Sequence, residues 1–278
     1  MKKIILFSIK GTTFSLIAVL VMTGCLALNI RENYNRLKHG VSRGVFLGDT
    51  LLERMLEHEV TDYVLSLSRD NFVRPRNAYL DSSTGVILPE AYGKKIDLQA
   101  TVKMIMEADP FTSHYPVYVE LDPEITADVY NKINNRIGSY MTGFGGGNRG
   151  ENIRLAAYLI NNTLVAPGEV FSFNKTTTPR KGDKRDYRLA PIIVGNSIVP
   201  GYGGGICQVA TTLYNAVKNA GLEIVERHPH SLPVDYVPRG MDATVSYDLD
   251  FKFRNDKDHF IMVKAADWGY RLVVEIWE

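Results

Sequence analysis

Cysteine is scarce in this chain, with two residues among 278, Cys25 and Cys207. No C-x-x-C pair or other cysteine cluster exists, so a disulfide framework and a cysteine-built structural zinc site are excluded by count. Charge of one sign is also lacking, because 32 basic and 31 acidic residues leave a formal net charge of +1. Dedicated nucleic-acid-binding proteins usually have a basic excess, so no nucleic-acid partner is expected.

The first thirty residues indicate export. Three lysines are followed by residues 11–30, an uncharged and mostly apolar run that is long enough to span a bilayer as a helix. The positive flank predicts that the rest of the chain lies outside the cytoplasmic membrane. The alternative is a lipoprotein signal, in which Cys25 of the Met22–Cys25 segment would be lipidated. Met22 is an unusual first lipobox residue and the apolar run continues to Ile30, which favours an uncleaved anchor.

The predicted fold class is α+β: a membrane-anchored chain with a small α+β N-terminal domain and a C-terminal α+β domain. The expected divisions are an anchor or signal at 1–30, a polar linker at 31–43, and domains at 44–122 and 123–278. The second domain is expected to end in an antiparallel β-meander. With Cys25 in the leader, Cys207 has no exported partner, so its thiol is either buried and inert or functional.

Local patterns predict the elements of both domains. Asp97 is expected to cap a helix. The loop 142–150, with five glycines in nine residues, is not expected to pack as an element but to be mobile or to wrap closely around something. A hairpin is expected over 191–199, with its turn at Gly195–Asn196. Apolar residues at helical spacing predict helices over 51–67, 98–106, 125–137, 153–160 and 208–220. Strands of the meander are expected over 243–253, 260–264 and 271–276.

The run Pro200–Gln208 carries the candidate nucleophile. Cys207 follows Gly203, Gly204 and Gly205 and precedes an amphipathic helix. At a helix N-terminus the macrodipole and free N–H groups favour a thiolate, so a lowered pKa is expected. The glycines would leave room for an acyl donor, and the N–H groups of this turn would face a tetrahedral oxyanion. The alternative is a structural cysteine that packs in a glycine-rich turn.

Two histidines follow on an expected strand, residues 222–228. Alternation would point His228 and His230 to one face, although Pro229 would end the strand and could turn His230 aside. One imidazole would act as general base toward Cys207, with His228 slightly preferred, and the other would orient it or contact substrate. Alternatively, one or both rings are structural hydrogen-bond partners, or the three side chains ligate a catalytic zinc. The sequence shows no typical pattern of residues that would support such zinc ligands, and no metal or other cofactor is expected.

The second half of the chain resembles the VanW family over about residues 136–265. The matching stretches are 152–157, 166–174, 200–215, 226–233, 242–245 and 250–255. The segment 44–121 resembles, less closely, the peptidoglycan-binding module that precedes some L,D-transpeptidases. The resemblance implies a cell-wall role and a link to vancomycin-resistance clusters. It further implies cysteine-dependent L,D-transpeptidase activity, with peptidoglycan stem peptides as partners.

Stem peptides carry carboxylates, which suggests further contacts. Weak candidates for substrate binding are Tyr202, Gln208, Arg239, Asp242 and the basic loop 180–188, which could equally be a solvated loop. Asp235 or Asp242 could also orient a histidine.

The leading hypothesis is therefore an extracytoplasmic L,D-transpeptidase that forms a thioester on Cys207. The first alternative is a cell-wall endopeptidase or carboxypeptidase with the same site, because the order of cysteine and histidine also resembles papain-like enzymes. The second is a non-catalytic wall-binding scaffold, which an unreactive thiol at neutral pH would favour.

Overall fold

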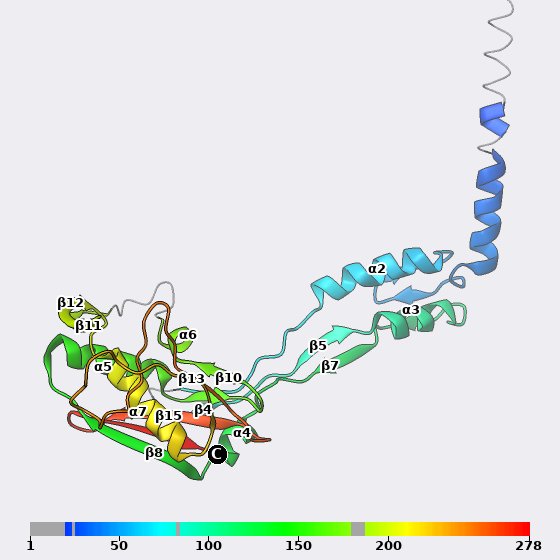
Figure 1. Cartoon of the computed structure of the whole chain (residues 1–278). Helices are drawn as coiled ribbons and strands as arrows, with labels where there is room; N and C mark the ends of the chain where they lie inside the picture. Colours follow the sequence, from blue (N-terminus) through cyan, green and yellow to red (C-terminus); the bar gives the residue numbers. More distant parts are fainter. Residues whose placement is uncertain (1–19, 24–25, 82–83, 179–186) are drawn as a thin grey trace, which may run out of the picture. The chain divides into compact units, whose positions relative to one another are not determined.

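The computed structural model describes residues 20–23, 26–81, 84–178 and 187–278 (Figure 1). Cys25 and most of the basic loop 180–188 lie outside these residues. The chain forms two compact units, one of residues 1–77 and 90–124 and the other of residues 78–89 and 125–278. The hairpin 78–89 thus groups with the second unit, and the domain limits expected from sequence stay a prediction. In the described ranges, no helix has the length and apolarity needed to cross a bilayer.

The first unit packs two helices over small sheets. Its elements are β1 (Phe46–Leu47), β2 (Thr50–Leu51), α2 (Glu57–Asp70), β5 (Gly93–Ile96), α3 (Leu98–Met106), β6 (Ser113–His114) and β7 (Tyr118–Leu121). β2, β1 and β6 form one sheet, and β5 pairs with β7. Residues 26–39 are helical, including most of the expected linker. Arg36 on this helix donates to both carboxylate oxygens of Glu59 on α2, at 2.6 and 2.7 Å.

Helix starts in this unit follow capping chemistry. The Asp97 side chain accepts a hydrogen bond from the Ala100 N–H at 2.9 Å, which confirms the expected cap of α3. The helix expected from residue 51 begins instead at Glu57. Leu51 belongs to β2, and the Leu52 N–H donates to the Val45 carbonyl. The sequence period was misleading there because these leucines are placed by a turn rather than by a helix.

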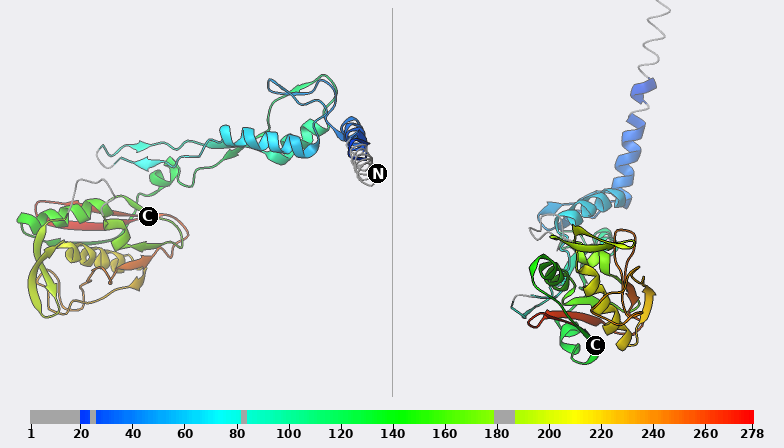
Figure 2. Two further views of the ribbon diagram at one scale, coloured as in Figure 1. Left: turned by 90° about the horizontal axis from the view of Figure 1, so that it is seen from above. Right: turned by 60° about the vertical axis from the view of Figure 1, so that its left-hand side comes forward.

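The second unit holds the remaining elements (Figure 2). They are β3 (Tyr79–Leu80), β4 (Ile87–Leu88), α4 (Ala127–Lys132), β8 (Arg136–Gly143), α5 (Gly147–Ile160), β9 (Thr163–Val165), β10 (Val170–Ser172), α6 (Phe173–Thr177), β11 (Leu189–Val194), β12 (Ser197–Tyr202), α7 (Ile206–Asn219), β13 (Glu223–Glu226), β14 (Lys252–Arg254), β15 (Ile261–Asp267) and β16 (Arg271–Trp277). An antiparallel sheet has the order β8-β16-β15-β9, and a second has the order β10-β14-β13.

Helices α5 and α7 pack on the four-stranded sheet and on each other. The apolar stripe expected on α7 is buried: Val209, Leu213, Ala216 and Val217 are all inaccessible and join one core with α5 and the strands. Burial of each large apolar side chain contributes about 1.5–3 kcal/mol, so this core fixes α7 against the sheet. The helix start that carries Cys207 is therefore held on a rigid base.

Two expectations about this unit are wrong. The glycine-rich stretch 142–150 does pack, because β8 ends at Gly143 and α5 begins at Gly147. Gly147 has φ +69°, and a Cβ on Gly150 would lie 2.4 Å from the Gly145 carbonyl oxygen, so the glycines permit a tight strand-to-helix turn. The α+β class is confirmed, but the terminal meander is not formed.

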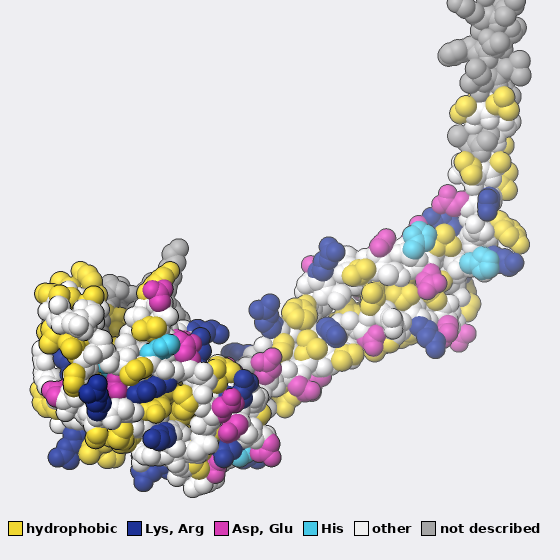
Figure 3. Space-filling model, in the orientation of Figure 1, with side chains coloured by type: hydrophobic (Ala, Val, Ile, Leu, Met, Phe, Trp, Pro, Cys, Tyr) yellow, Lys and Arg dark blue, Asp and Glu magenta, His cyan; other side chains and the backbone are white. Residues whose placement is uncertain are grey.

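The last strands are divided between two sheets. β14 pairs with β10 and β13, whereas β15 and β16 form an antiparallel hairpin between β9 and β8. The expected strand 243–253 is extended only at β14. Its preceding residues instead bond to α7 and to the histidine segment. The hairpin 191–199 is confirmed as β11–β12, and Figure 3 shows hydrophobic side chains gathered over it.

Candidate functional site

Cys207 is the second residue of α7. Gly205 caps the helix with φ +109°, and Gly203 before it has φ +81°. Both values lie in the region that glycine adopts without a Cβ penalty. The Ile206 N–H donates to the Gly203 carbonyl and the Gln208 N–H to the Gly205 carbonyl, each at 3.0 Å. The thiol therefore sits at a helix N-terminus, as expected.

The glycines serve close packing of this turn. A Cβ on Gly204 would lie 2.4 Å from the Pro191 carbonyl oxygen, and one on Gly205 would lie 2.9 Å from the Arg149 carbonyl oxygen. Glycine is therefore required at positions 204 and 205 because backbone of β11 and α5 lies so close. This reason differs from the expectation that the glycines leave room for an acyl donor. The Gly203 N–H donates to the Arg188 carbonyl at 3.2 Å. The N–H groups of Gly204 and Gly205 have no acceptor among the described residues.

Replacing Gly204 with alanine is expected to destabilise the second unit by about 1–3 kcal/mol, because backbone at Pro191 cannot yield as a flexible side chain would. Chemical denaturation followed by circular dichroism measures this loss. Gly145→Ala is the matched control, since a Cβ there meets nothing within 4 Å. Equal stability of the two variants would show that the turn is not tightly packed.

The Cys207 thiol is half-buried and donates to the Val245 carbonyl at 3.4 Å. Burial raises the pKa of the thiol, and the negative charge of Asp242 adds to the effect. Hydrogen bonding to the backbone at Val245 and Cys207 and the positive charge of Arg149 act in the opposite direction without reversing it. The expected lowering of the pKa at the helix start is therefore wrong, because desolvation outweighs the helix N-terminus.

His230 forms a buried pair with Asp242. The ring Nδ1 lies 2.8 Å from Asp242 Oδ2, the His230 backbone N–H donates to the same oxygen at 2.6 Å, and the two side chains are 6% and 8% exposed. Arg227 donates to the other carboxylate oxygen at 3.2 Å. Burial opposes ionisation of Asp242, but the hydrogen bonds from His230 prevail and lower its pKa.

This pairing sets the tautomer of His230. An ionised carboxylate only accepts hydrogen bonds, so Nδ1 carries a proton, and the tautomer with its single proton on Nδ1 has Nε2 as an acceptor. Asp242 therefore orients a histidine, one of the two roles considered for it. The Asp242 side chain is only 8% exposed, so its burial does not support the weaker expectation that Asp242 contacts substrate.

His228 faces a different group. Its Nε2 lies 3.1 Å from Glu226 Oε1, and its side chain is 38% exposed. Strand β13 ends at Glu226, so the expected alternation does not extend through both histidines. The His228 backbone carbonyl accepts a hydrogen bond from the Thr244 N–H at 2.7 Å. Thus the two imidazoles have separate carboxylate partners rather than a shared one.

Glu226 predicts an acid-dependent stability. Its pKa is lowered to about 2, first by Lys252, then by the Asp250 N–H and His228. A depressed carboxylate stabilises the fold above its unfolded pKa of about 4.3 and loses this effect as the pH falls toward 2. Glu226→Gln is expected to cost at most about 1 kcal/mol near neutral pH, since the ion pair is partly exposed. Melting temperatures of the two proteins should converge on acidification; a constant difference would contradict the ion pair.

Residues 241–245 join α7 to the histidines. The Val245 carbonyl accepts from Cys207, Ala243 exchanges hydrogen bonds with the Thr211 hydroxyl, and the Met241 carbonyl accepts from Asn215. On the other side, Thr244 and Asp242 bind His228 and His230. Cys207 and the His230–Asp242 pair are therefore anchored to one five-residue segment. Sequence patterns did not show this arrangement, because the segment has no regular period.

An open cavity of about 480 Å³ lies beside the start of α7. It is lined by Gly143, Phe144, Gly145, Arg149, Gln208, Asp235, Tyr236, Gly269, Tyr270 and Arg271. Gln208 is buried, and its amide group donates to Thr142 and Gly143 and accepts from Arg149 at 2.8 Å. Arg149 and Arg271 were not identified from the sequence; no motif marks them, since only folding brings them together.

The remaining candidates lie apart from this arrangement. Tyr202, at the end of β12, is 76% exposed, and Arg239 is exposed in a loop. No hydrogen bond or ion pair links either side chain to Cys207 within the part of the chain that is described. Nor do the described residues contain a group of three His, Cys, Asp or Glu side chains that could hold a metal ion. The alternative zinc site of Cys207, His228 and His230 is therefore not formed.

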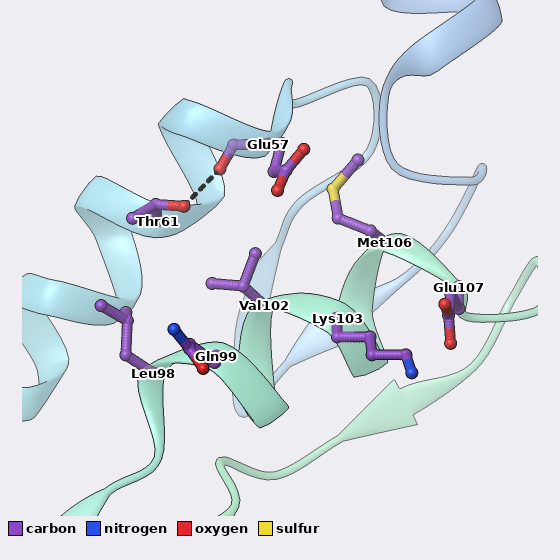
Figure 4. A pocket seen from close by; sticks show the side chains of 8 residues that line it. All are labelled: Glu57, Thr61, Leu98, Gln99, Val102, Lys103, Met106 and Glu107. Carbon is purple, nitrogen blue, oxygen red and sulfur yellow. Dashed lines mark hydrogen bonds between the residues drawn. The ribbon is translucent and has the colours of Figure 1, made fainter.

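A larger cavity, about 670 Å³, lies in the first unit between α2 and α3 (Figure 4). Leu98, Val102 and Met106 give it an apolar wall, and Glu57, Glu107 and Lys103 contribute charges at its edges.

Comparisons with known proteins cover most of the chain. A family described as "VanW like protein" matches residues 148–277, somewhat later than the expected 136–265. "Uncharacterized protein YoaR" of Bacillus subtilis (strain 168) is 36% identical over 234 residues, covering 80% of this chain and 76% of that protein. "Vancomycin B-type resistance protein VanW" of Enterococcus faecalis (strain ATCC 700802 / V583) is 33% identical over 114 residues, or 38% of this chain and 41% of that protein. No solved structure matches the chain significantly. The matched range 148–277 contains the positions of Cys207, His230 and Asp242, and the chain belongs to the VanW family.

Proposed function

We propose that this protein is an extracytoplasmic L,D-transpeptidase that cross-links peptidoglycan stem peptides through a thioester on Cys207. The observation that carries the proposal is the common anchoring of the Cys207 thiol and the buried His230–Asp242 pair on residues 241–245. A nucleophile, a base and a group that orients the base are the parts of covalent acyl transfer. A relative named for vancomycin resistance is consistent with work at the cell wall.

In the first half-reaction, Cys207 Sγ attacks the carbonyl carbon that precedes the terminal D-residue of a donor stem. His230 Nε2 accepts the thiol proton as the C–S bond forms. The amide C–N bond then breaks, and the leaving amine takes the proton from the imidazolium. The products are an acyl thioester and a free D-amino acid.

In the second half-reaction, an amine of a neighbouring stem attacks the thioester carbonyl. His230 accepts a proton from this amine, the C–S bond breaks, and the thiolate recovers a proton. A new amide joins the two stems, so atoms and charge balance without a cofactor. Water in place of the amine would give the hydrolase, which is the second candidate function.

The raised pKa of Cys207 favours a base that acts during attack. A thiol that is protonated at rest gains little from its position alone and needs a nearby acceptor for its proton. His230 suits this role better than His228, because Asp242 fixes its tautomer and would stabilise the imidazolium. A non-catalytic scaffold would also contain an unreactive thiol. Low reactivity of Cys207 toward alkylating agents therefore does not distinguish the enzyme from the scaffold.

The rest of the chain has a place in the proposal. The N-terminal segment would tether the protein to the cytoplasmic membrane, with both units on its outer face. The cavity between α2 and α3 would contact peptidoglycan, consistent with the resemblance of this segment to a wall-binding module. The backbone N–H groups of Gly204, Gly205 and Cys207 would face the tetrahedral oxyanion.

The test is to incubate the full chain with purified disaccharide-tetrapeptides. A transpeptidase gives a protein adduct equal to the donor without its terminal residue, seen by intact mass, and cross-linked dimers seen by chromatography. Shortened monomers without dimers would indicate the hydrolase. A folded protein that forms neither adduct nor product would indicate the scaffold.

A further inference from the structure

We propose that the cavity beside α7 is a carboxylate-binding subsite, in which Arg149 and Arg271 hold the α-carboxylate of the donor's terminal D-residue. This inference rests on the proposed function and adds the part of the substrate that the cavity recognises. Neither arginine was a candidate from the sequence. They come from α5 and from the first position of β16, more than a hundred residues apart.

The charges that line the cavity favour an anion. Arg271 has no hydrogen-bond or ion-pair partner for its guanidinium among the described residues, and Arg149 uses one nitrogen on Gln208. Asp235 is the single acidic residue of the lining, and it is exposed. A guanidinium presents several N–H groups in a fixed fork that matches a carboxylate in two-point hydrogen bonds.

The protein holds Arg149 in place before any ligand binds. Gln208 is buried and its amide nitrogen donates to Thr142 and Gly143, so its carbonyl oxygen is aimed at Arg149. On the other side, the Arg149 guanidinium lies 5.8 Å from the centre of the Tyr236 ring. A side chain that is already ordered loses less entropy on binding, which increases affinity.

The cavity is next to the proposed nucleophile. Gln208 follows Cys207 directly and lines the cavity. Arg149, which also lines the cavity, packs against the turn that precedes Cys207, because a Cβ on Gly205 would lie 3.0 Å from Arg149 Cγ. The terminal carboxylate of a donor lies one residue beyond the bond to be cleaved, about 3.5 Å along an extended chain. A carbonyl at Cys207 would therefore place that carboxylate near Arg149.

The walls suit a small terminal residue. Phe144 and Tyr270 pack edge to face at 5.9 Å, and Tyr236 adds a third ring. Burial raises the pKa of the Tyr236 hydroxyl, so this phenol stays neutral and adds no negative charge beside a bound carboxylate. Apolar rings with two guanidinium groups fit a D-residue that has a short side chain and a free carboxylate.

The experiment uses the full chain with Cys207→Ala, so that binding is measured without turnover. The probes are a stem tetrapeptide with a free C-terminal carboxylate and the same peptide as its C-terminal amide, each titrated by calorimetry. We expect the free acid to bind at least about tenfold more tightly than the amide. Adding Arg271→Gln should remove most of this preference while leaving the affinity for the amide unchanged.

Arg74→Gln is the control, because Arg74 is an exposed arginine outside the cavity and is not a candidate for substrate binding. Equal affinities for acid and amide, or equal losses in the two arginine variants, would overturn the subsite. Thioester formation by the wild-type chain is followed in parallel. A thioester without a preference for the free acid overturns the subsite and keeps the transpeptidase. A preference for the acid without any thioester supports the subsite and overturns the transpeptidase.

Discussion

Replacement of Cys207 by alanine is expected to abolish thioester formation and cross-linking, a loss of roughly 10⁴-fold or more. Cys207 is the one cysteine among the described residues, and the other cysteine of the sequence, Cys25, belongs to the expected leader, so neither expected domain supplies a second thiol for the attack. The fold should persist, because the half-buried sulfur makes one long hydrogen bond, at 3.4 Å, and its removal costs about 1 kcal/mol. Intact mass after incubation with tetrapeptides measures the adduct, and thermal unfolding measures the fold.

Cys207→Ser is the matched control for packing, since serine keeps a donor for the Val245 carbonyl. Both variants should be folded and unable to cross-link. A folded Cys207→Ala protein that produces dimers at the wild-type rate would exclude the proposed nucleophile.

Replacement of His230 by glutamine is expected to slow thioester formation by about 10²–10⁴-fold, whereas His228→Gln should change it only a few-fold. Glutamine keeps a donor for Asp242 but has no basic nitrogen. The pH profile distinguishes a histidine that acts as the base from one that only supports the structure. Without a base, the rate of thioester formation should follow the fraction of Cys207 that is thiolate. Because burial raises the pKa of Cys207, that rate should keep rising well into alkaline pH.

The measurement is the initial rate of adduct formation from neutral to alkaline pH in the three proteins. His228→Gln is the matched control, because its ring pairs with Glu226 at the surface instead of with the buried Asp242. A larger loss in His228→Gln than in His230→Gln would reverse the assignment of the base.

The direction of the Cys207 pKa follows from magnitudes. A helix N-terminus stabilises a nearby anion by about 0.3–1 kcal/mol, less than the 1.36 kcal/mol that corresponds to one pKa unit. Desolvation of a group packed under other residues can exceed this value several-fold. The position of a cysteine at a helix start is therefore insufficient evidence for a thiolate, and burial has to be known as well.

Several features could be predicted from residues alone because they are local. Asp97 caps α3, Gly195–Asn196 turns the β11–β12 hairpin, and Cys207 starts α7, each through backbone preferences within a few residues. Family membership was also visible in the residues around Cys207 and His228. Such features depend on steric and hydrogen-bond interactions between residues close in sequence, which do not require the tertiary fold.

Long-range features were decided by the tertiary fold. The strands expected to form one terminal meander divide between two sheets, because β14 pairs with β10 and β13 whereas β15 and β16 lie between β9 and β8. Three features of the site depend on residues far apart in sequence. They are the contact of Asp242 with His230 rather than His228, the burial that raises the pKa of Cys207, and the position of Arg149 and Arg271 in the lining of one cavity. Desolvation and charge act through distance in space, and that distance exists only after the core has closed.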